Sequence, residues 1–92
     1  MKVNQSEIKK NWQARGFSCD LWTDPPGQLW ENYVHDIDEL FMVVEGEVEL
    51  EIQGKKTYLK IGEEIFIPAR ENHSVSNIGK SHSKWLYGYK QV

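Results

Sequence analysis

The sequence predicts an all-β fold, a barrel or a sandwich of antiparallel strands. Short alternating or apolar segments follow one another, and turn-forming residues separate them about every 8–12 residues, which is typical of this class. One short segment near the N-terminus alone has helical character. With 92 residues the chain fits a single domain, residues 1–92, with a helix at about 6–15 and a barrel at about 17–90.

The expected helix begins at Ser6, whose hydroxyl can cap the first turn, with Glu7 directly behind it. Ile8 and Trp12 lie four residues apart and therefore share one face. Gly16 then ends the helix. A helix of about three turns is marginal alone, so we expect the apolar face to pack against the barrel.

The remaining segments read as strands. The residues after Gly16 alternate between apolar and polar, the run Leu40–Val44 is apolar on both faces, and Val48–Ile52 alternates with glutamates. A hairpin turn is expected at residues 53–56. The predicted strands are residues 17–21, 29–35, 40–44, 48–52, 57–61, 65–67, 73–78 and 84–89.

Composition excludes several classes of function. Eleven basic against 14 acidic residues give a net charge of −3, which argues against nucleic-acid binding. No apolar run is long enough to span a membrane, and the first residues lack the apolar stretch of a signal peptide. The single cysteine, Cys19, excludes an internal disulfide and suits a reducing compartment. We therefore expect a cytoplasmic protein whose small core favours a metal or a homodimer.

Two histidines and one glutamate are the candidate metal ligands. Strand alternation places His35 and Glu39 on one face, and His73 on a face of a later strand. If both faces line one barrel interior, two imidazoles and one carboxylate converge, which is a plausible set for a divalent metal. The residues predicted by the same alternation to line this pocket are Tyr33, Phe41 and Asn77.

The residues around these side chains have a regular spacing. Residues 27–46 read G-x5-Y-x-H-x3-E-x6-G, and residues 62–77 read G-x5-P-x-R-x2-H-x3-N. These spacings resemble the two motifs of the cupin superfamily, in which the first has His-x-His before the glutamate and the second has Pro-x-Gly before the histidine. The resemblance covers about half the chain, and every spacing in it agrees.

The resemblance implies a six- to eight-stranded antiparallel β-barrel of the jelly-roll type with a metal in its mouth, so that the expected fold is such a barrel preceded by the one short N-terminal helix. His35, Glu39 and His73 match ligand positions of the family. The implied cofactor is one divalent ion, which His/Glu ligation allows to be Fe, Mn, Ni or Zn.

Two residues depart from the family pattern. Tyr33 stands where the first ligand histidine is usual; because the pKa of a phenol is ordinarily about 10, we expect it to line the pocket rather than to ligate. Loss of metal binding is the alternative. Arg70 stands where glycine is usual, so a positive φ there would cost about 1 kcal/mol. Its guanidinium either lies on the surface or meets an anionic group of a substrate.

Three classes of function stay open, because a fold does not fix a reaction. The first is a metal-dependent oxygenase, isomerase or lyase acting on a small organic metabolite. The second is a non-catalytic protein that binds a small ligand. The third is a dimeric scaffold whose metal site has degenerated.

Overall fold

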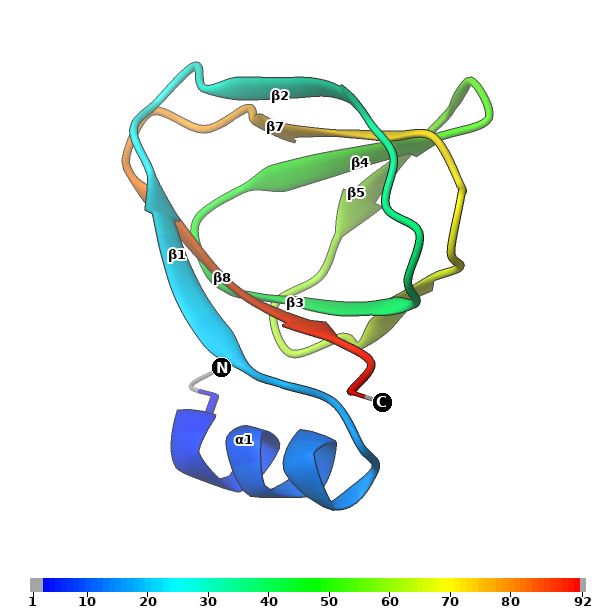
Figure 1. Cartoon of the computed structure of the whole chain (residues 1–92). Helices are drawn as coiled ribbons and strands as arrows, with labels where there is room; N and C mark the ends of the chain where they lie inside the picture. The colour runs from blue at the N-terminus through cyan, green and yellow to red at the C-terminus, as the bar shows by residue number, and fades with distance from the viewer. Residues whose placement is uncertain (1–2, 92) are drawn as a thin grey trace.

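The computed structural model describes residues 3–91, apart from the side chain of Asn32, so residues 1, 2 and 92 of the predicted domain lie outside the described part. Within residues 3–91 one helix precedes eight strands in two four-stranded antiparallel sheets (Figure 1). The elements are α1 (Gln5–Ala14), β1 (Asp20–Asp24), β2 (Leu29–Tyr33), β3 (Glu39–Glu45), β4 (Val48–Ile52), β5 (Lys55–Leu59), β6 (Ile65–Ile67), β7 (His73–Asn77) and β8 (Ser83–Tyr89).

The two sheets face each other and the chain alternates between them. One sheet has the strand order β1-β8-β3-β6 and the other β2-β7-β4-β5. Only the β4–β5 hairpin connects successive strands of one sheet within the described residues; every other step crosses to the opposite sheet (Figure 1). This topology confirms the predicted antiparallel jelly-roll barrel.

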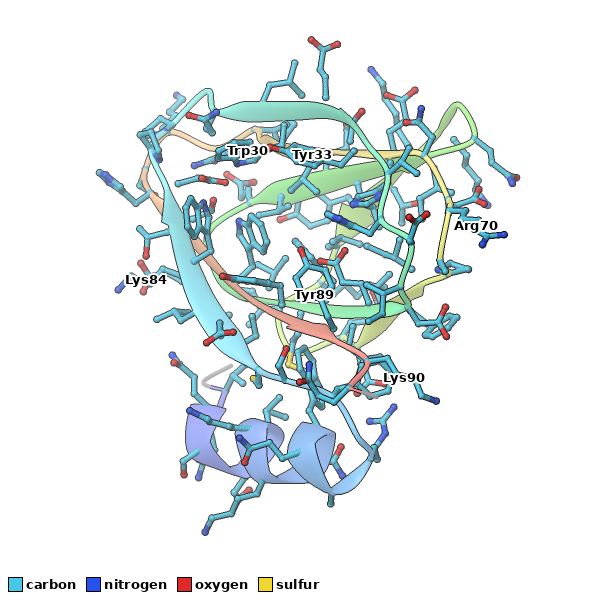
Figure 2. All side chains as sticks on the ribbon, in the orientation of Figure 1. Trp30, Tyr33, Arg70, Lys84, Tyr89 and Lys90 are labelled. Atoms are coloured by element: carbon cyan, nitrogen blue, oxygen red, sulfur yellow. The ribbon has the colours of Figure 1, made fainter. Side chains whose placement is uncertain are left out.

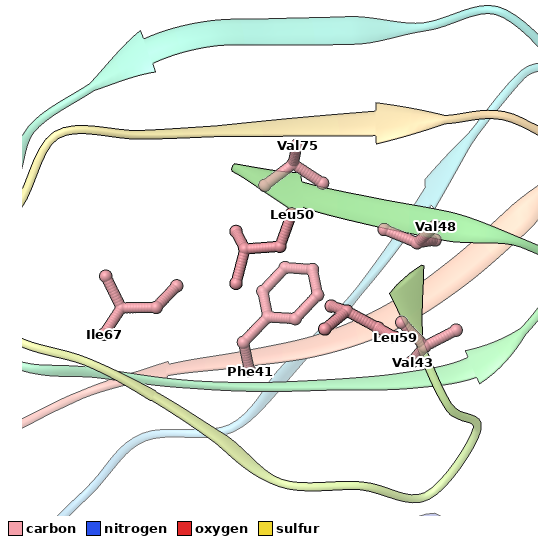
Figure 3. Packing of buried hydrophobic residues seen from close by; sticks show 7 residues of the cluster. All are labelled: Phe41, Val43, Val48, Leu50, Leu59, Ile67 and Val75. Carbon is pink, nitrogen blue, oxygen red and sulfur yellow. The ribbon is translucent and has the colours of Figure 1, made fainter. Parts of the chain in front are cut away.

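Strand β3 is buried on both faces because each face packs against a different layer. Phe41 and Val43 point into the barrel, whereas Leu40 and Met42 pack against the helix side with Trp12. The barrel core fills the space between the sheets (Figure 3). Its buried members are Phe41, Val43, Val48, Leu50, Leu59, Ile67 and Val75.

Helix α1 covers the outer face of the sheet that contains β3. Trp12 is fully buried there, as its position on the apolar face predicts, and its indole N–H donates to Glu64 Oε1 at 3.0 Å. The predicted cap at Ser6 is wrong. Asn4 is the N-cap, because its Oδ1 accepts a hydrogen bond from the backbone N–H of Glu7 at 3.2 Å.

Some strand boundaries also differ from the prediction. The first strand begins at Asp20 rather than at Phe17, because Phe17 and Cys19 pack into the layer beneath the helix. Strand β5 begins two residues early, since Gln53 and Gly54 both adopt positive φ and make a two-residue turn. Among residues 3–91 no helix combines the length and the apolar character that crossing a membrane requires.

Candidate metal centre

The second strand ends at Tyr33, so His35 lies in the loop before β3 and not in a strand as predicted. Its backbone is nevertheless fixed, because the carbonyl oxygen of His35 accepts a hydrogen bond from the N–H of Arg70 at 2.6 Å. Asp38 Oδ1 accepts a second one from the N–H of Ala69 at 2.8 Å. The turn between β6 and β7 thereby holds the loop that carries His35.

His35, Glu39 and His73 come together at the barrel mouth. Glu39 begins β3 and His73 begins β7, in opposite sheets. Glu39 Oε1 lies 3.6 Å from His35 Nε2 and 3.7 Å from His73 Nε2. One ligand atom from each of the three residues lies within 4.8 Å of the other two. The structure therefore brings together the three side chains predicted as ligands.

Glu39 has an unsatisfied buried oxygen. The residue is 4% exposed, and its Oε1 has no hydrogen-bond partner. Burial raises the pKa of the Glu39 carboxyl to about 7. A buried acceptor without a donor is costly, and it faces two imidazole nitrogens at ligand spacing.

The Nε2 atom of each histidine faces this oxygen. His73 Nδ1 lies 3.1 Å from the carbonyl oxygen of Glu71, so the ring donates its Nδ1–H there and Nε2 keeps a lone pair. Burial and, to a lesser degree, His73 lower the pKa of His35, which favours its neutral form. Neutral imidazoles are the form that binds metal ions.

The spacing fits one ion. Ligand nitrogens and oxygens about 2.0–2.2 Å from a metal stand about 3.0–3.6 Å from one another. Of the two distances to Glu39 Oε1, that of 3.6 Å lies at the upper limit of this range and that of 3.7 Å exceeds it by a tenth of an ångström. Together with the unpaired oxygen and the tautomer of His73, the donor set suits a divalent ion that accepts nitrogen and oxygen ligands.

The cluster opens into a cavity of ≈ 250 Å³. Its lining includes the three candidate ligands together with Phe41 and Val75, and aromatic side chains form the rest. Trp30, Tyr33 and Tyr89 lie around this interior in Figure 2. The aromatic lining residues outside the core are Trp22, Trp30, Tyr33, Trp85, Tyr87 and Tyr89.

Tyr33 lines this cavity beside the cluster, as does Phe41. The ring of Tyr33 stacks on His35 with 5.9 Å between centroids and lies 6.4 Å from the ring of His73. The hydroxyl of Tyr89 also lies close to His35, 3.5 Å from Nε2. Burial raises the pKa of Tyr89 to about 12, and the nearby Glu39 adds to this shift, so its phenol stays protonated at neutral pH.

Asn77 does not belong to the cavity lining, contrary to the prediction. It is buried at the far end of β7, where its Nδ2 donates to the carbonyl oxygens of Pro25 and Ser81, each at 3.0 Å. Its Oδ1 accepts from the N–H of Gly79, also at 3.0 Å. The motif asparagine therefore joins two loops instead of facing a ligand.

Arg70 adopts φ +66°, so the predicted left-handed position exists and a non-glycine residue occupies it. Its guanidinium lies on the surface, with Nε 3.9 Å from Asp36 Oδ1 and both side chains more than four-fifths exposed. It is not among the cavity residues.

Sequence reasoning missed Asp24. This carboxylate is 2% exposed and accepts hydrogen bonds from the indole N–H groups of three tryptophans. Trp22 Nε1 lies 2.7 Å from Oδ1, Trp30 Nε1 lies 3.0 Å from Oδ2, and Trp85 Nε1 lies 3.2 Å from Oδ2. In the sequence Asp24 precedes two prolines and reads as part of a turn, so no local signal marks it.

A small jelly-roll barrel with a two-histidine, one-carboxylate cluster in its mouth defines a class, and comparison with known proteins names it. The family model described as "Cupin domain" matches residues 20–89. The chain belongs to this family, as the motif spacing predicts. A comparison with curated proteins found no match.

Solved structures share this fold at low sequence identity. A cupin superfamily protein from Desulfitobacterium hafniense has a TM-score of 0.72 at 20% identity, over 83% of this chain and 68% of its own. A protein from Thermotoga maritima, described as a predicted oxalate decarboxylase, has a TM-score of 0.74 at 22% identity, and the match covers 90% of this chain and 74% of that protein's chain. The cupin domain of an XRE family transcriptional regulator from Enterobacter cloacae has a TM-score of 0.74 at 20% identity, and the match covers 88% of each chain.

The chain is shorter than several of these neighbours. It spans 57% of the chain that contains the Schizosaccharomyces pombe Cnp3 cupin domain and 43% of an oxalate oxidase chain solved with glycolate. At these identities the likeness concerns the fold alone.

Proposed function

We propose that this cupin binds one divalent metal ion through His35, Glu39 and His73, and that the adjoining aromatic cavity holds a small organic molecule against it. The ion is Fe, Mn, Ni or Zn, all of which accept this donor set. Three protein ligands leave coordination positions open toward the cavity.

The strongest support for a bound metal ion is the unpaired Oε1 of buried Glu39, which lies between two imidazole nitrogens. A structural glutamate at this depth would be expected to have a donor. A cation supplies the missing partner, and it returns the carboxyl to its ionised form. The alternative of a degenerate site leaves this oxygen without any role.

The residues around the cluster suit the placement of a ligand. When bound, the ion supplies Lewis-acid polarisation of an oxygen-bearing group of that ligand. The aromatic walls bury its remaining atoms, and Tyr89 presents a protonated hydroxyl next to His35 for hydrogen bonding. A carboxylate fits such a site, and two neighbours carry names from oxalate chemistry.

A binding protein without turnover is the second candidate function. Apart from the three cluster residues, the titratable side chains among the described cavity residues are the tyrosines Tyr33, Tyr87 and Tyr89. A protonated phenol donates a proton or a hydrogen bond but is a poor base at neutral pH. Metal-dependent turnover of a metabolite would favour an oxygenase, isomerase or lyase over this candidate.

Elemental analysis of freshly purified protein tests the metal proposal. We expect close to one divalent ion per chain in the wild type and about tenfold less in His35→Ala and His73→Ala. His82→Ala is the matched control, because His82 is exposed and outside the cluster, and it should retain the metal. Equal metal content in all four proteins would contradict this site, and no metal in the wild type would support the degenerate scaffold.

The homodimer and the cytoplasmic location stay predictions from size and composition. Exposed apolar side chains support association, and they include Leu21, Leu29, Val34, Tyr58, Phe66 and Ile78. Sedimentation velocity at micromolar concentration distinguishes a dimer of this 10.8 kDa chain from a monomer.

A further inference from the structure

Six aromatic rings form a closed circle around the cavity. Each ring contacts the next with 5.1–6.5 Å between centroids, and five of the six contacts have interplanar angles between 61° and 78°. All neighbouring rings except the stacked pair Tyr33 and His35 therefore meet roughly edge to face. In order around the circle they are Trp22, Trp30, Tyr33, His35, Tyr89 and Tyr87.

The two ends of this cavity differ in chemistry. His35, with Glu39 and His73, marks the metal end. At the opposite end Trp22 and Trp30 turn their N–H edges toward Asp24, and Trp85 does the same. Since these three indole donors are used, that end offers a ligand aromatic surface and no indole hydrogen bond.

Asp24 places a negative charge behind the tryptophans. It accepts three donors, which suits the ionised, acceptor-only form of a carboxylate. Among the described residues no lysine, arginine or histidine forms an ion pair with it, and neither lysine nor arginine lines the cavity. The buried charge therefore lacks a cation, and hydrogen bonding to it enriches the indole π faces in electron density.

We propose that the cavity selects a small zwitterion, with a methylated ammonium group in the aromatic circle and a carboxylate at the metal end. Aromatic faces backed by a carboxylate attract a cation. A methylated ammonium suits them better than a primary one, because it is weakly hydrated and needs no hydrogen-bond acceptors. The carboxylate half of this inference rests on the proposed metal site, whereas the ammonium half does not.

Two isosteric probes isolate the charge. Trimethylglycine and 3,3-dimethylbutanoate have the same shape and the same carboxylate, and they differ in a cationic nitrogen against a neutral carbon. Calorimetric titration into the Zn²⁺-loaded full chain should give a Kd at least tenfold lower for trimethylglycine. Equal or tighter binding of the carbon analogue, or binding of neither probe, would overturn the proposal.

Metal uptake measured on the same samples separates the two proposals. One ion per chain without a preference for trimethylglycine contradicts the zwitterion inference alone. No metal uptake, with tetramethylammonium still quenching tryptophan fluorescence at concentrations where tert-butanol does not, contradicts the metal site and retains the cation-binding circle.

Variants of the circle provide the matched controls. Trp22→Leu should reduce the preference for trimethylglycine to less than threefold, and Trp22→Phe should keep part of it, while both bind metal as the wild type does. Tyr58→Leu, an exposed aromatic on β5 outside the cavity, should leave the preference unchanged. Asp24→Asn should weaken trimethylglycine binding by removing the charge. Because that variant disturbs a buried residue, the Trp22 pair decides the test: an unchanged preference in Trp22→Leu contradicts the proposal.

Discussion

Single residues carry most of the chemistry in this barrel, and the motif spacing located three of them. His35, Glu39 and His73 could be predicted together from the motif spacing, and the structure brings them together although His35 lies in the loop before β3, where strand alternation does not apply. Asp24 could not be found in this way. Its three indole partners come from β1, β2 and β8, so its role depends on contacts that only the folded barrel creates.

Glu39 makes the metal-free protein sensitive to pH. Its pKa is about 7 in the folded state against an ordinary 4.5, so the folded protein holds more protons between these values. The carboxyl therefore lowers the free energy of unfolding as the pH rises from 4.5 through 7, by on the order of 3 kcal/mol in total. Glu39→Gln should be more stable than wild type by that order at pH 8 and nearly equal to it at pH 4.5. Urea denaturation of metal-free protein across this range measures the difference, and a difference independent of pH would contradict the account.

Arg70 holds a left-handed conformation that glycine adopts without strain. Arg70→Gly should therefore raise the free energy of unfolding by about 1 kcal/mol. The ion pair lost with Asp36 contributes little, since both side chains are largely in solvent. Urea denaturation measures the change, and unchanged or lower stability would show that other contacts of the arginine offset the strain.

At the scale of elements, turn residues and apolar runs located the strands, and local packing moved their ends. Phe17 lies outside the first strand, contrary to the prediction, because it packs into the apolar layer beneath α1. His35 lies beyond the end of β2 because pairing with β7 stops at Tyr33. Gly88 shows a constraint invisible in one sequence. A Cβ there would collide with the backbone carbonyl of Ser18 and with the ring of Trp12, so this β8 position requires glycine.

Asn77 connects the β1–β2 turn to the β7–β8 loop through its side-chain amide. Asn77→Ala should lower the free energy of unfolding by about 2–3 kcal/mol, because it leaves buried carbonyl groups without donors. Asn72→Ala, at an exposed position before β7, is the control and should stay within about 0.5 kcal/mol of wild type. Chemical denaturation measures both. Equal stability of the two variants would contradict the structural role of Asn77.

At the scale of the whole molecule, a short chain forms two apolar layers. The barrel interior and the layer beneath α1 share β3, which explains why its sequence is apolar on both faces. The sequence-based prediction of an all-β barrel succeeded because the strands are regular and punctuated. The residues that line the cavity were harder to predict, because aromatic side chains are equally common in a packed core and in the wall of a binding cavity.

Metal binding should stabilise the entire domain, because an ion that binds only the folded state shifts the unfolding equilibrium by mass action. At a free concentration one hundred times the Kd the gain is about 2.7 kcal/mol. For a domain of this size it corresponds to a rise in Tm of about 10–20 °C. Calorimetry with and without Zn²⁺ measures the shift, and excess chelator should reverse it. An unchanged Tm at saturating metal would count against a site built into the fold.

The most direct test of the central claim is a calorimetric titration of metal-free protein with a divalent ion, wild type beside Glu39→Gln. The account predicts one ion per chain in the wild type, with proton release above that of ordinary carboxylates near pH 7, because the Glu39 carboxyl is about half protonated there. It predicts binding at least about tenfold weaker in Glu39→Gln. Equal affinity and stoichiometry in the two proteins, or no binding in the wild type, would contradict it.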